Sequence, residues 1–254
     1  MSLPLALLLL LAAPARAQDA AYAAPLEPAV VVSEPAPPVD DFAGFDDEFK
    51  AEKPVSDPLR FWNRPFFHFN DKFYFWLAKP VSRTYGYVVP KPARTAVDRG
   101  FHNMRWPVRF VGSLLQLKMR RAGDETRRFL VNSTLGVGGL FDPADRWFGW
   151  RRPPDEDLGQ ALGYWGVGQG FPFTIPLMGP SNLRDGLMII PTMLLSPVPY
   201  VTDFPTGMGV AAGEQMNYVS LHIGEYESLK KDALDPYAFT RDAYRKNREK
   251  KIKE

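Results

Sequence analysis

DPLRFWNRPFFHFNDKFYFWLAK, residues 57–79, is the most distinctive stretch of this 254-residue chain. Asp57 followed by Pro58 is a typical helix start, because aspartate caps free backbone N–H groups and proline suits the first turn. A helical segment is therefore predicted from Asp57 onward. Pro65 lacks a backbone N–H, so we expect it to kink or divide this helix.

Nine aromatic residues lie between Phe61 and Trp76, with basic and polar residues between them. Aromatics on several faces of one helix, alternating with basic side chains, are typical of a bilayer interface, where rings lie at headgroup depth. The alternative is a buried core helix of a soluble bundle. The residues expected to contact membrane or lipid are Phe66, Phe67, Phe69, Phe73 and Trp76.

The residues before this segment predict export. Residues 1–17 have an apolar core of about a dozen residues, which is too short to span a bilayer, and they end in Ala15-Arg16-Ala17. This pattern predicts a signal peptide cleaved after Ala17. Residues 18–56 are rich in Ala, Pro and acidic residues, so we expect a disordered linker.

The charge is unevenly distributed along the chain. The formal net charge is +2, of which residues 1–17 supply +1 and residues 18–58 supply −8, leaving +9 for residues 59–254. A basic body suits an anionic surface such as phospholipid or nucleic acid. Export favours the membrane and makes nucleic acid an improbable partner.

Amphipathic helices are predicted over residues 92–104, 108–118 and 124–135. In the third helix, Phe129, Leu130 and Thr134 are expected to face inward, with Arg127 and Arg128 outward. Glycines 136, 138 and 139 then predict a flexible turn.

The second half of the chain is broken by glycine and proline. Residues 158–186 cannot form one long helix, and residues 171–177 are expected to be extended, as one strand of a small pair. The apolar stretch Leu187–Val201 contains three prolines; it fits a segment lying in or re-entering the membrane, or a buried hairpin. A helix is predicted over Asp203–Leu229, and a last helix from Asp235 into a basic tail at residues 241–254.

Catalytic constellations are missing from the sequence. The chain has no cysteine, and its three histidines lack metal-ligand spacing. A Gly-x-Ser-x-Gly nucleophile elbow is also missing. The carboxylates at 155–157 lie in a proline-rich polar loop and are expected to be solvated. We therefore predict no enzyme activity, no metal and no cofactor.

Several blocks, taken in order, match a known family. They include Phe61-Trp62-Asn63-Arg64, Val89-Pro90-Lys91-Pro92-Ala93-Arg94, Arg128 to Gly139 with Phe141-Asp142-Pro143-Ala144, Gly159 to Gly168, Gly179 to Gly186, and Asp235-Pro236-Tyr237. On these blocks residues 57–245 resemble the VacJ/MlaA family of phospholipid-transport proteins. In domain terms, we expect the family-like domain at 57–240.

The resemblance implies a mainly α-helical fold: a ring-like bundle of amphipathic helices in the outer membrane around a central channel, with at most a short β segment. It implies removal of mislocalised phospholipid from the outer leaflet and transfer to a periplasmic lipid carrier. It also implies association with a trimeric porin. Family members are commonly lipoproteins, whereas this chain has no cysteine to acylate, so we expect an unlipidated protein on the periplasmic side of the outer membrane.

Candidate residues for the lipid path follow from this reading. Arg94 and Arg184 are candidates for headgroup or channel contact, although Arg184 could instead pair with Asp185 or cap a helix. Gly136, Gly138 and Gly139 could form a gating loop, or a plain helix C-cap. A porin-associated structural protein that transfers no lipid is the main alternative function, followed by a membrane-active hydrolase.

Overall fold

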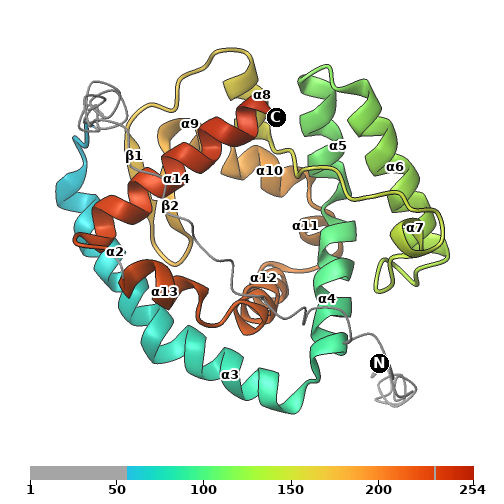
Figure 1. The fold of residues 1–254 in the computed structure, drawn as a ribbon, viewed down its shortest axis with the longest axis horizontal. Coiled ribbons are helices and arrows are strands. Elements are labelled where there is room, and N and C mark those ends of the chain that lie inside the picture. The colour runs from blue at the N-terminus through green and yellow to red at the C-terminus, as the bar shows by residue number, and fades with distance from the viewer. Residues whose placement is uncertain (1–55, 232) are drawn as a thin grey trace, which may run out of the picture. The chain divides into compact units, whose positions relative to one another are not determined.

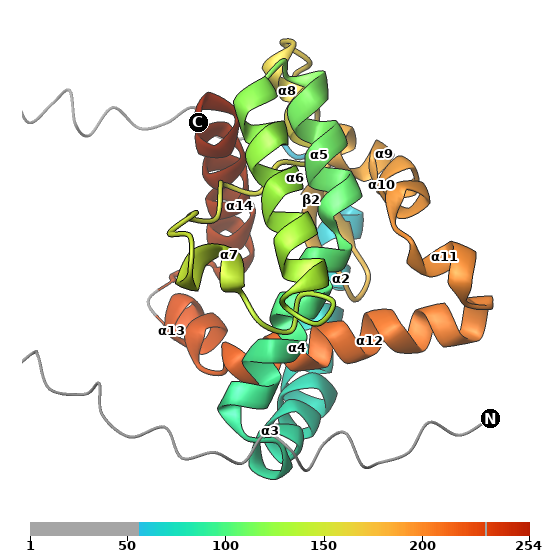
Figure 2. The ribbon, with the colours of Figure 1, turned by 90° about the vertical axis from the view of Figure 1, so that its right-hand side faces the viewer.

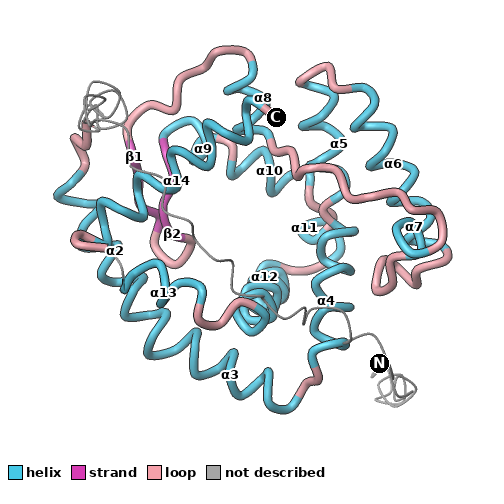
Figure 3. Tube along the Cα trace, viewed as in Figure 1, coloured by secondary structure: helices cyan, strands magenta, loops and turns pink. Residues whose placement is uncertain are grey.

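In the computed structural model, residues 56–231 and 233–254 are described, and they belong to one compact unit, Pro54–Glu254. The signal peptide and most of the linker predicted above lie outside the described residues. The described part is mainly helical with one short β-hairpin, as predicted (Figure 3). Its elements are α2 (Arg60–Phe73), η3 (Tyr74–Ala78), α3 (Lys79–Val88), α4 (Lys91–Met104), α5 (Trp106–Leu115), α6 (Met119–Thr134), α7 (Pro143–Arg146), α8 (Leu158–Tyr164), β1 (Pro172–Ile175), β2 (Gly179–Asn182), α9 (Leu183–Leu187), α10 (Ile189–Leu195), α11 (Val198–Val201), α12 (Phe204–Leu221), α13 (Glu225–Lys231) and α14 (Pro236–Lys253).

The helices of this unit follow one another around a ring (Figure 1). Helices α2 and α3 form one arc, α4, α5 and α6 form the opposite side, and α14 passes over the hairpin toward α8. In the view turned by 90°, α9 to α12 extend to one side of the unit, whereas α7, α13 and α14 lie on the other (Figure 2). The ring-like helical prediction is confirmed.

The first helix starts later than predicted. Helix α2 begins at Arg60, with Leu59 at the N-cap position and no side-chain cap. Asp57 does not cap it, because its carboxylate has tertiary partners: Asn63 Nδ2 donates to it at 2.8 Å, and the Tyr237 hydroxyl donates to its other oxygen. A cap motif predicted from local sequence is thus replaced by a contact with α14.

Pro65 does not divide α2, which runs through it to Phe73. The irregularity comes later, as the π-helix η3, directly before Pro80 in the first turn of α3. A proline ring clashes with the carbonyl four residues earlier in an α-helix, and the wider π-turn gives it room. The three elements therefore form one long, continuous arc.

Two helix predictions in the first half hold closely, and one shifts. The helices predicted over 92–104 and 108–118 correspond to α4 and α5, whereas α6 begins at Met119, five residues before the predicted start. Helix α3 ends where Val89, which precedes Pro90, adopts an extended conformation (φ −101°, ψ 118°). This is the conformation that a following proline favours.

In the second half, the extended segment forms β1, which pairs antiparallel with β2 in the register Phe173 with Ser181. The apolar stretch 187–201 folds as the end of α9 and the short helices α10 and α11, not as a hairpin. Within the described residues, no helix has the length and apolarity needed to cross a bilayer.

The C-terminal helices follow the predicted starts. The helix predicted over Asp203–Leu229 is split into α12 and α13 at Gly224. Gly224 has φ +102°, a left-handed conformation that glycine adopts without steric cost. Asp235 caps α14 by accepting from the backbone N–H groups of Tyr237 and Ala238. As predicted, the last helix continues into the basic residues: α14 is uninterrupted to Lys253, with no boundary at residue 240.

Candidate functional site

The interior of the described unit is polar. Eighteen polar or charged residues are buried, against nine apolar or aromatic ones. The largest side chains that are completely enclosed are all polar: Gln116, Gln160, Asn63, Asn217, Ser82 and Ser113. In a water-soluble domain, buried side chains are mostly apolar. In this protein the distribution of polar and apolar side chains between interior and surface is the reverse, which we call inverted polarity.

The exterior correspondingly presents large apolar side chains. Of the five aromatics predicted to contact lipid, Trp76 is 76% exposed and Phe69 is 47% exposed, while Phe66 and Phe73 are half-buried. Phe67 is buried and packs edge-on against Tyr237 of α14, at 5.8 Å between ring centres. The structure therefore divides the five: Phe67 is a packing residue, and the others are available to contact lipid.

Helix α6 shows the inversion most clearly. Arg128, predicted to face outward, is 5% exposed, whereas Leu130, predicted to face inward, is 56% exposed. Arg128 Nη2 donates to both oxygens of Asp142 at 2.9 and 2.8 Å, and Asn132 Nδ2 donates to the same carboxylate at 2.9 Å. The face of α6 that carries Arg128 and Asn132 is buried because Asp142 pairs with both side chains, and Leu130 on another face is exposed.

Exposed apolar side chains also belong to α9 to α12, the helices that extend to one side of the unit (Figure 2). We call the exposed apolar residues of this stretch the apolar arc: Leu187, Ile190, Met193, Leu194, Tyr200, Val201, Phe204 and Met208. An exposed apolar surface of this extent marks contact with membrane or with another protein.

Both arginines predicted to bind headgroups are engaged within the fold. Arg94 donates from Nε to the Val89 carbonyl at 3.0 Å and from Nη1 to the Ser220 carbonyl at 2.6 Å, which ties α4 to the ends of α3 and α12. Arg184 is 4% exposed and pairs with Asp185 at 3.0 Å. The local pair weighed as an alternative for Arg184 is the arrangement observed, so any headgroup contact by either arginine stays a prediction.

The glycines predicted to gate the path form a packed turn after α6. Gly139 has φ +94°, and a Cβ atom built there would lie 2.3 Å from Asn103 Cβ. Gly136 is buried, and Gly138 faces open space with φ +70°. Asn103 Nδ2 also donates to the Gly138 carbonyl at 3.3 Å. The turn is thus fixed against α4 in this structure, and a gating role remains a proposal.

In the acidic loop at 155–157, which was predicted to be solvated, Asp155 is exposed as expected, whereas Glu156 is buried. Glu156 is 2% exposed and accepts from Gln116 Nε2 at 2.7 Å, from Lys118 Nζ at 2.8 Å and from the Arg121 guanidinium. Its partners lie 35–40 residues earlier in the chain. The loop therefore joins α8 to the α5–α6 corner.

A second buried cluster connects α8, α9 and α14. The Arg248 guanidinium donates to both oxygens of Asp157 at 2.6 and 2.8 Å, and its Nε lies 2.7 Å from Asp185 Oδ2. Asp157 also caps α8 in a reciprocal capping box with Gln160. Gly159 makes room for this cluster, because a Cβ atom there would lie 2.3 Å from Asp185 Oδ1.

The hairpin is attached to α2 by two asparagines on one helix face, seven residues apart. Asn63 accepts from Thr174 N at 2.7 Å and donates to the Pro172 carbonyl at 3.0 Å. Asn70 accepts from Leu177 N at 2.7 Å and donates to the Ile175 carbonyl at 2.9 Å. These side chains pair with the hairpin backbone as a neighbouring strand would.

Replacing Asn70 with Ala is expected to loosen the hairpin tip. Leu177 has φ +67°, a costly conformation for a residue with a side chain. The side-chain oxygen of Asn70 accepts a hydrogen bond from the backbone N–H of Leu177 in this conformation. Losing both bonds should destabilise the tip by about 1–3 kcal/mol. Hydrogen exchange of the Leu177 amide measures this. Asn70→Asp keeps the acceptor and should lose less protection; unchanged exchange in Asn70→Ala would contradict the prediction.

His102 and Asp155 form a pH-sensitive pair. His102 Nε2 and Asp155 Oδ1 are 3.0 Å apart. Burial lowers the pKa of His102 below its usual 6.5, and this outweighs the opposing effect of Asp155. For Asp155, burial alone would raise the pKa, but the hydrogen bond and charge of His102, with Arg109 and Arg152, lower it to about 2.

Stability is therefore expected to fall as the pH drops below 6.5. Between 6.5 and the lowered pKa of folded His102, the unfolded chain binds the additional proton, so acidification favours unfolding. Asp155 adds a further loss from pH 3.8 down toward 2. Thermal unfolding midpoints at pH 7.5 and 5.0 test the first effect. His102→Gln cannot titrate and should flatten the difference; an equal drop in that variant would assign the effect to other groups.

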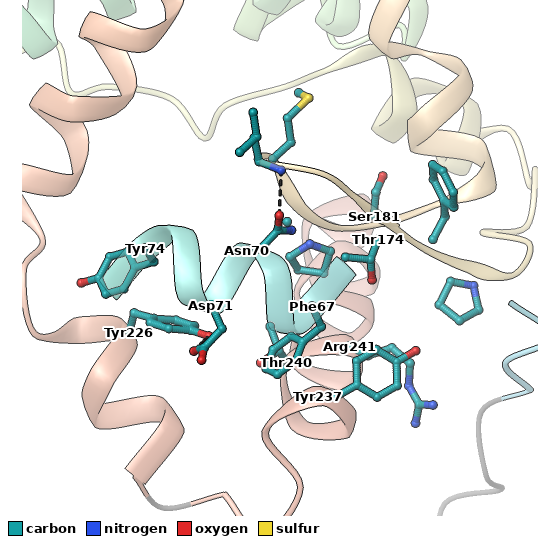
Figure 4. Close-up of a pocket in the computed structure, with 16 residues that line it drawn as sticks. Phe67, Asn70, Asp71, Tyr74, Thr174, Ser181, Tyr226, Tyr237, Thr240 and Arg241 are labelled. Atoms are coloured by element: carbon teal, nitrogen blue, oxygen red, sulfur yellow. Dashed lines mark hydrogen bonds between the residues drawn. The ribbon is translucent and has the colours of Figure 1, made fainter. Parts of the chain in front are cut away.

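One apolar cavity of about 210 Å³ lies between α2, the hairpin, α13 and α14. Figure 4 shows Phe67, Tyr74, Tyr226 and Tyr237 around it, with Ser181 and Thr174 on the hairpin side. The Asn70 bond to Leu177 closes the hairpin end of the cavity.

The fold and the inverted polarity together define a class: a mainly α-helical protein that exposes large apolar side chains at its surface and buries charged side chains in paired clusters.

Comparison with known proteins identifies the family. The family model described as MlaA lipoprotein matches residues 55–251. An uncharacterised protein of Rickettsia conorii is 31% identical over 78% of both chains. The Escherichia coli intermembrane phospholipid transport system lipoprotein MlaA is 28% identical over 74% of this chain and 75% of its own. A solved structure described as the structural basis for maintenance of bacterial outer membrane lipid asymmetry matches with a TM-score of 0.69 and 28% identity, covering 78% of this chain and 99% of that one. This chain belongs to the MlaA family.

Proposed function

We propose that this protein is an outer-membrane component of an intermembrane phospholipid transport system. It takes up phospholipid mislocalised to the outer leaflet and passes it to a periplasmic lipid carrier, which maintains lipid asymmetry, without catalysing a reaction. The observation that supports this most directly is the inverted polarity: enclosed side chains such as Gln116 and Asn217 are polar, while Trp76 and Ile190 are exposed. Relatives named for phospholipid transport point the same way.

The inverted polarity also accounts for how such a protein stays at the membrane. Exposed aromatics on α2 and η3 and the apolar arc bury apolar area in lipid, each side chain contributing about 1.5–3 kcal/mol. We propose that these surfaces replace the lipid anchor of the lipoprotein relatives, because this chain has no cysteine. The same proposal includes cleavage of the signal peptide after Ala17 and a mature protein without a lipid anchor. It also includes a lipid channel at the centre of the ring and association with a trimeric porin.

Mass spectrometry of lipids bound to the mature protein, purified from outer membranes in mild detergent, tests the proposal. Phospholipid is expected in clear excess over a porin purified in parallel. Deleting the protein should place phospholipid in the outer leaflet, and restoring it should remove that phospholipid. Membrane-associated protein without bound phospholipid, and with unchanged asymmetry on deletion, would favour a structural, porin-bound protein instead. Release of free fatty acid by pure protein would indicate a hydrolase.

A further inference from the structure

We propose that the apolar cavity between α2, the hairpin, α13 and α14 binds the terminal part of one acyl chain of a phospholipid. This inference rests on the proposed function and assigns part of the lipid to a specific place. The cavity is distinct from the arginines first expected to meet the lipid, since neither Arg94 nor Arg184 lines it.

The cavity is large enough for only a fragment of a lipid molecule. Ligand pockets that enclose a whole small molecule measure about 300–1,000 Å³, and this cavity measures about 210 Å³. An apolar cavity of about 150 Å³ binds benzene, with its six carbons. By proportion, this one accommodates roughly eight carbon atoms of a chain, so the rest of the lipid lies outside it.

The lining selects an apolar ligand, because its polar groups are already satisfied. The Tyr237 hydroxyl donates to Asp57, and the Tyr226 hydroxyl donates to Asp71 at 2.8 Å. Both ends of the Asn70 amide bond the hairpin backbone. The tyrosine hydroxyls are thus engaged by carboxylates, and the rings line the space (Figure 4). Apolar matter gains from displacing water there, and a polar group would find few partners.

The charges around the cavity argue against a headgroup in it. Lys230 Nζ lies 2.8 Å from both oxygens of Asp71. Arg241, which lines the cavity, donates to Asp242 at 2.8 Å. These cations are neutralised by adjacent carboxylates, so a phosphate entering the cavity would meet as much negative as positive charge. The acyl chain is the part of a phospholipid that fits.

Photolabelling tests where the terminal part of the acyl chain lies in the protein. The full mature protein is placed in vesicles of phosphatidylethanolamine and phosphatidylglycerol that contain phosphatidylethanolamine with a diazirine near the terminal methyl of one chain. A matched probe has the diazirine near the ester. We expect the terminal probe to label peptides 67–74, 173–181 and 236–241 severalfold more than the ester probe does. Equal labelling by both probes, or none above the rest of the protein, overturns the inference.

Filling the cavity supplies the second test. Thr240→Phe and Ser181→Leu place larger side chains on the part of the wall formed by α14 and on the part formed by the hairpin, and each should lower the labelling at least fivefold. Using two positions guards against one variant that fails to fold. Thr84→Phe is the matched control, because Thr84 is an exposed helical threonine that, like Thr240, bonds the carbonyl four residues earlier. Labelling should be unchanged there. Undiminished labelling in both folded cavity variants overturns the inference.

Failure of the inference is separable from failure of the proposed function. If wild-type protein co-purifies with phospholipid and maintains lipid asymmetry while the cavity stays unlabelled, only the acyl site is wrong. If wild-type protein retains no phospholipid and does not alter asymmetry, the proposed function fails and the site with it.

Discussion

Arg248→Met is expected to destabilise the protein strongly, by about 3 kcal/mol, the lower end of the range for breaking a buried ion pair. Arg248 is 7% exposed and pairs with Asp157 and Asp185, so its removal takes a cation from both carboxylates. Asp185 keeps its pair with Arg184 at 3.0 Å. The loss of one partner from a buried ionic cluster is costly because it leaves buried negative charge with less compensation. The C-terminal half of α14 should then detach from α8 and α9.

Thermal unfolding in detergent measures this effect. For a domain of this size, the expected loss lowers the unfolding midpoint by on the order of 10 °C. Lys250→Met is the matched control on the same helix, since Lys250 is 78% exposed and its pair with Glu254 spans 4.0 Å; exposed pairs contribute about 0–1 kcal/mol. Arg248→Lys retains the charge but not the two-sided fork and should be intermediate. Equal midpoints for Arg248→Met and Lys250→Met would show that the cluster adds no net stability.

The pH dependence of the same cluster has a definite direction. Burial alone would raise the pKa of Asp185, but the charge of Arg248 and the hydrogen bonds from Tyr244, Arg184 and Arg248 lower it below 3.8. A carboxylate with a depressed folded pKa stabilises the protein above its unfolded pKa, and this contribution is lost as the pH falls through 3.8 toward the folded value.

Local sequence signals predicted the helices well and their surroundings poorly. The Asp235-Pro236 cap and the glycine-broken segment before the hairpin were predicted because they depend on neighbouring residues. Helix α6 differs: periodicity identifies which residues share a face, but not whether that face meets protein or lipid. Arg128 and Leu130 were therefore assigned to the wrong sides, on the assumption that a protein interior is apolar.

The buried ion clusters could not have been found from spacing. Glu156 appeared to be one of three solvated carboxylates, because its partners Lys118 and Arg121 lie 38 and 35 residues away. Arg248 appeared to belong to a basic tail, and Asp157 lies 91 residues before it. Gly159 belongs to one of the blocks that resemble the family, but the resemblance does not explain why a glycine is needed there. The structure does, because a side chain at this position would clash with Asp185.

Ile190→Asp is expected to weaken membrane association on the order of a hundredfold. Ile190 lies on α10, is 69% exposed, and belongs to the apolar arc. A charged side chain in the apolar part of a bilayer costs about 2.5–3.5 kcal/mol, and 1.4 kcal/mol is a tenfold change in an equilibrium. Co-flotation with phospholipid vesicles measures the change as a shift of protein from the floating to the unbound fraction.

The control for this variant adds the same group where the surface is already polar. Asn247→Asp, at an exposed position of α14, should leave flotation unchanged, because a carboxylate there stays in water. If both variants float as the wild type does, the apolar arc does not enter lipid, and a protein partner is the remaining explanation for its exposed side chains. In that case Ile190→Asp should instead release a partner that co-purifies with the wild type. The two outcomes separate anchoring by lipid from anchoring by protein, which exposure alone cannot do, since apolar surfaces serve both.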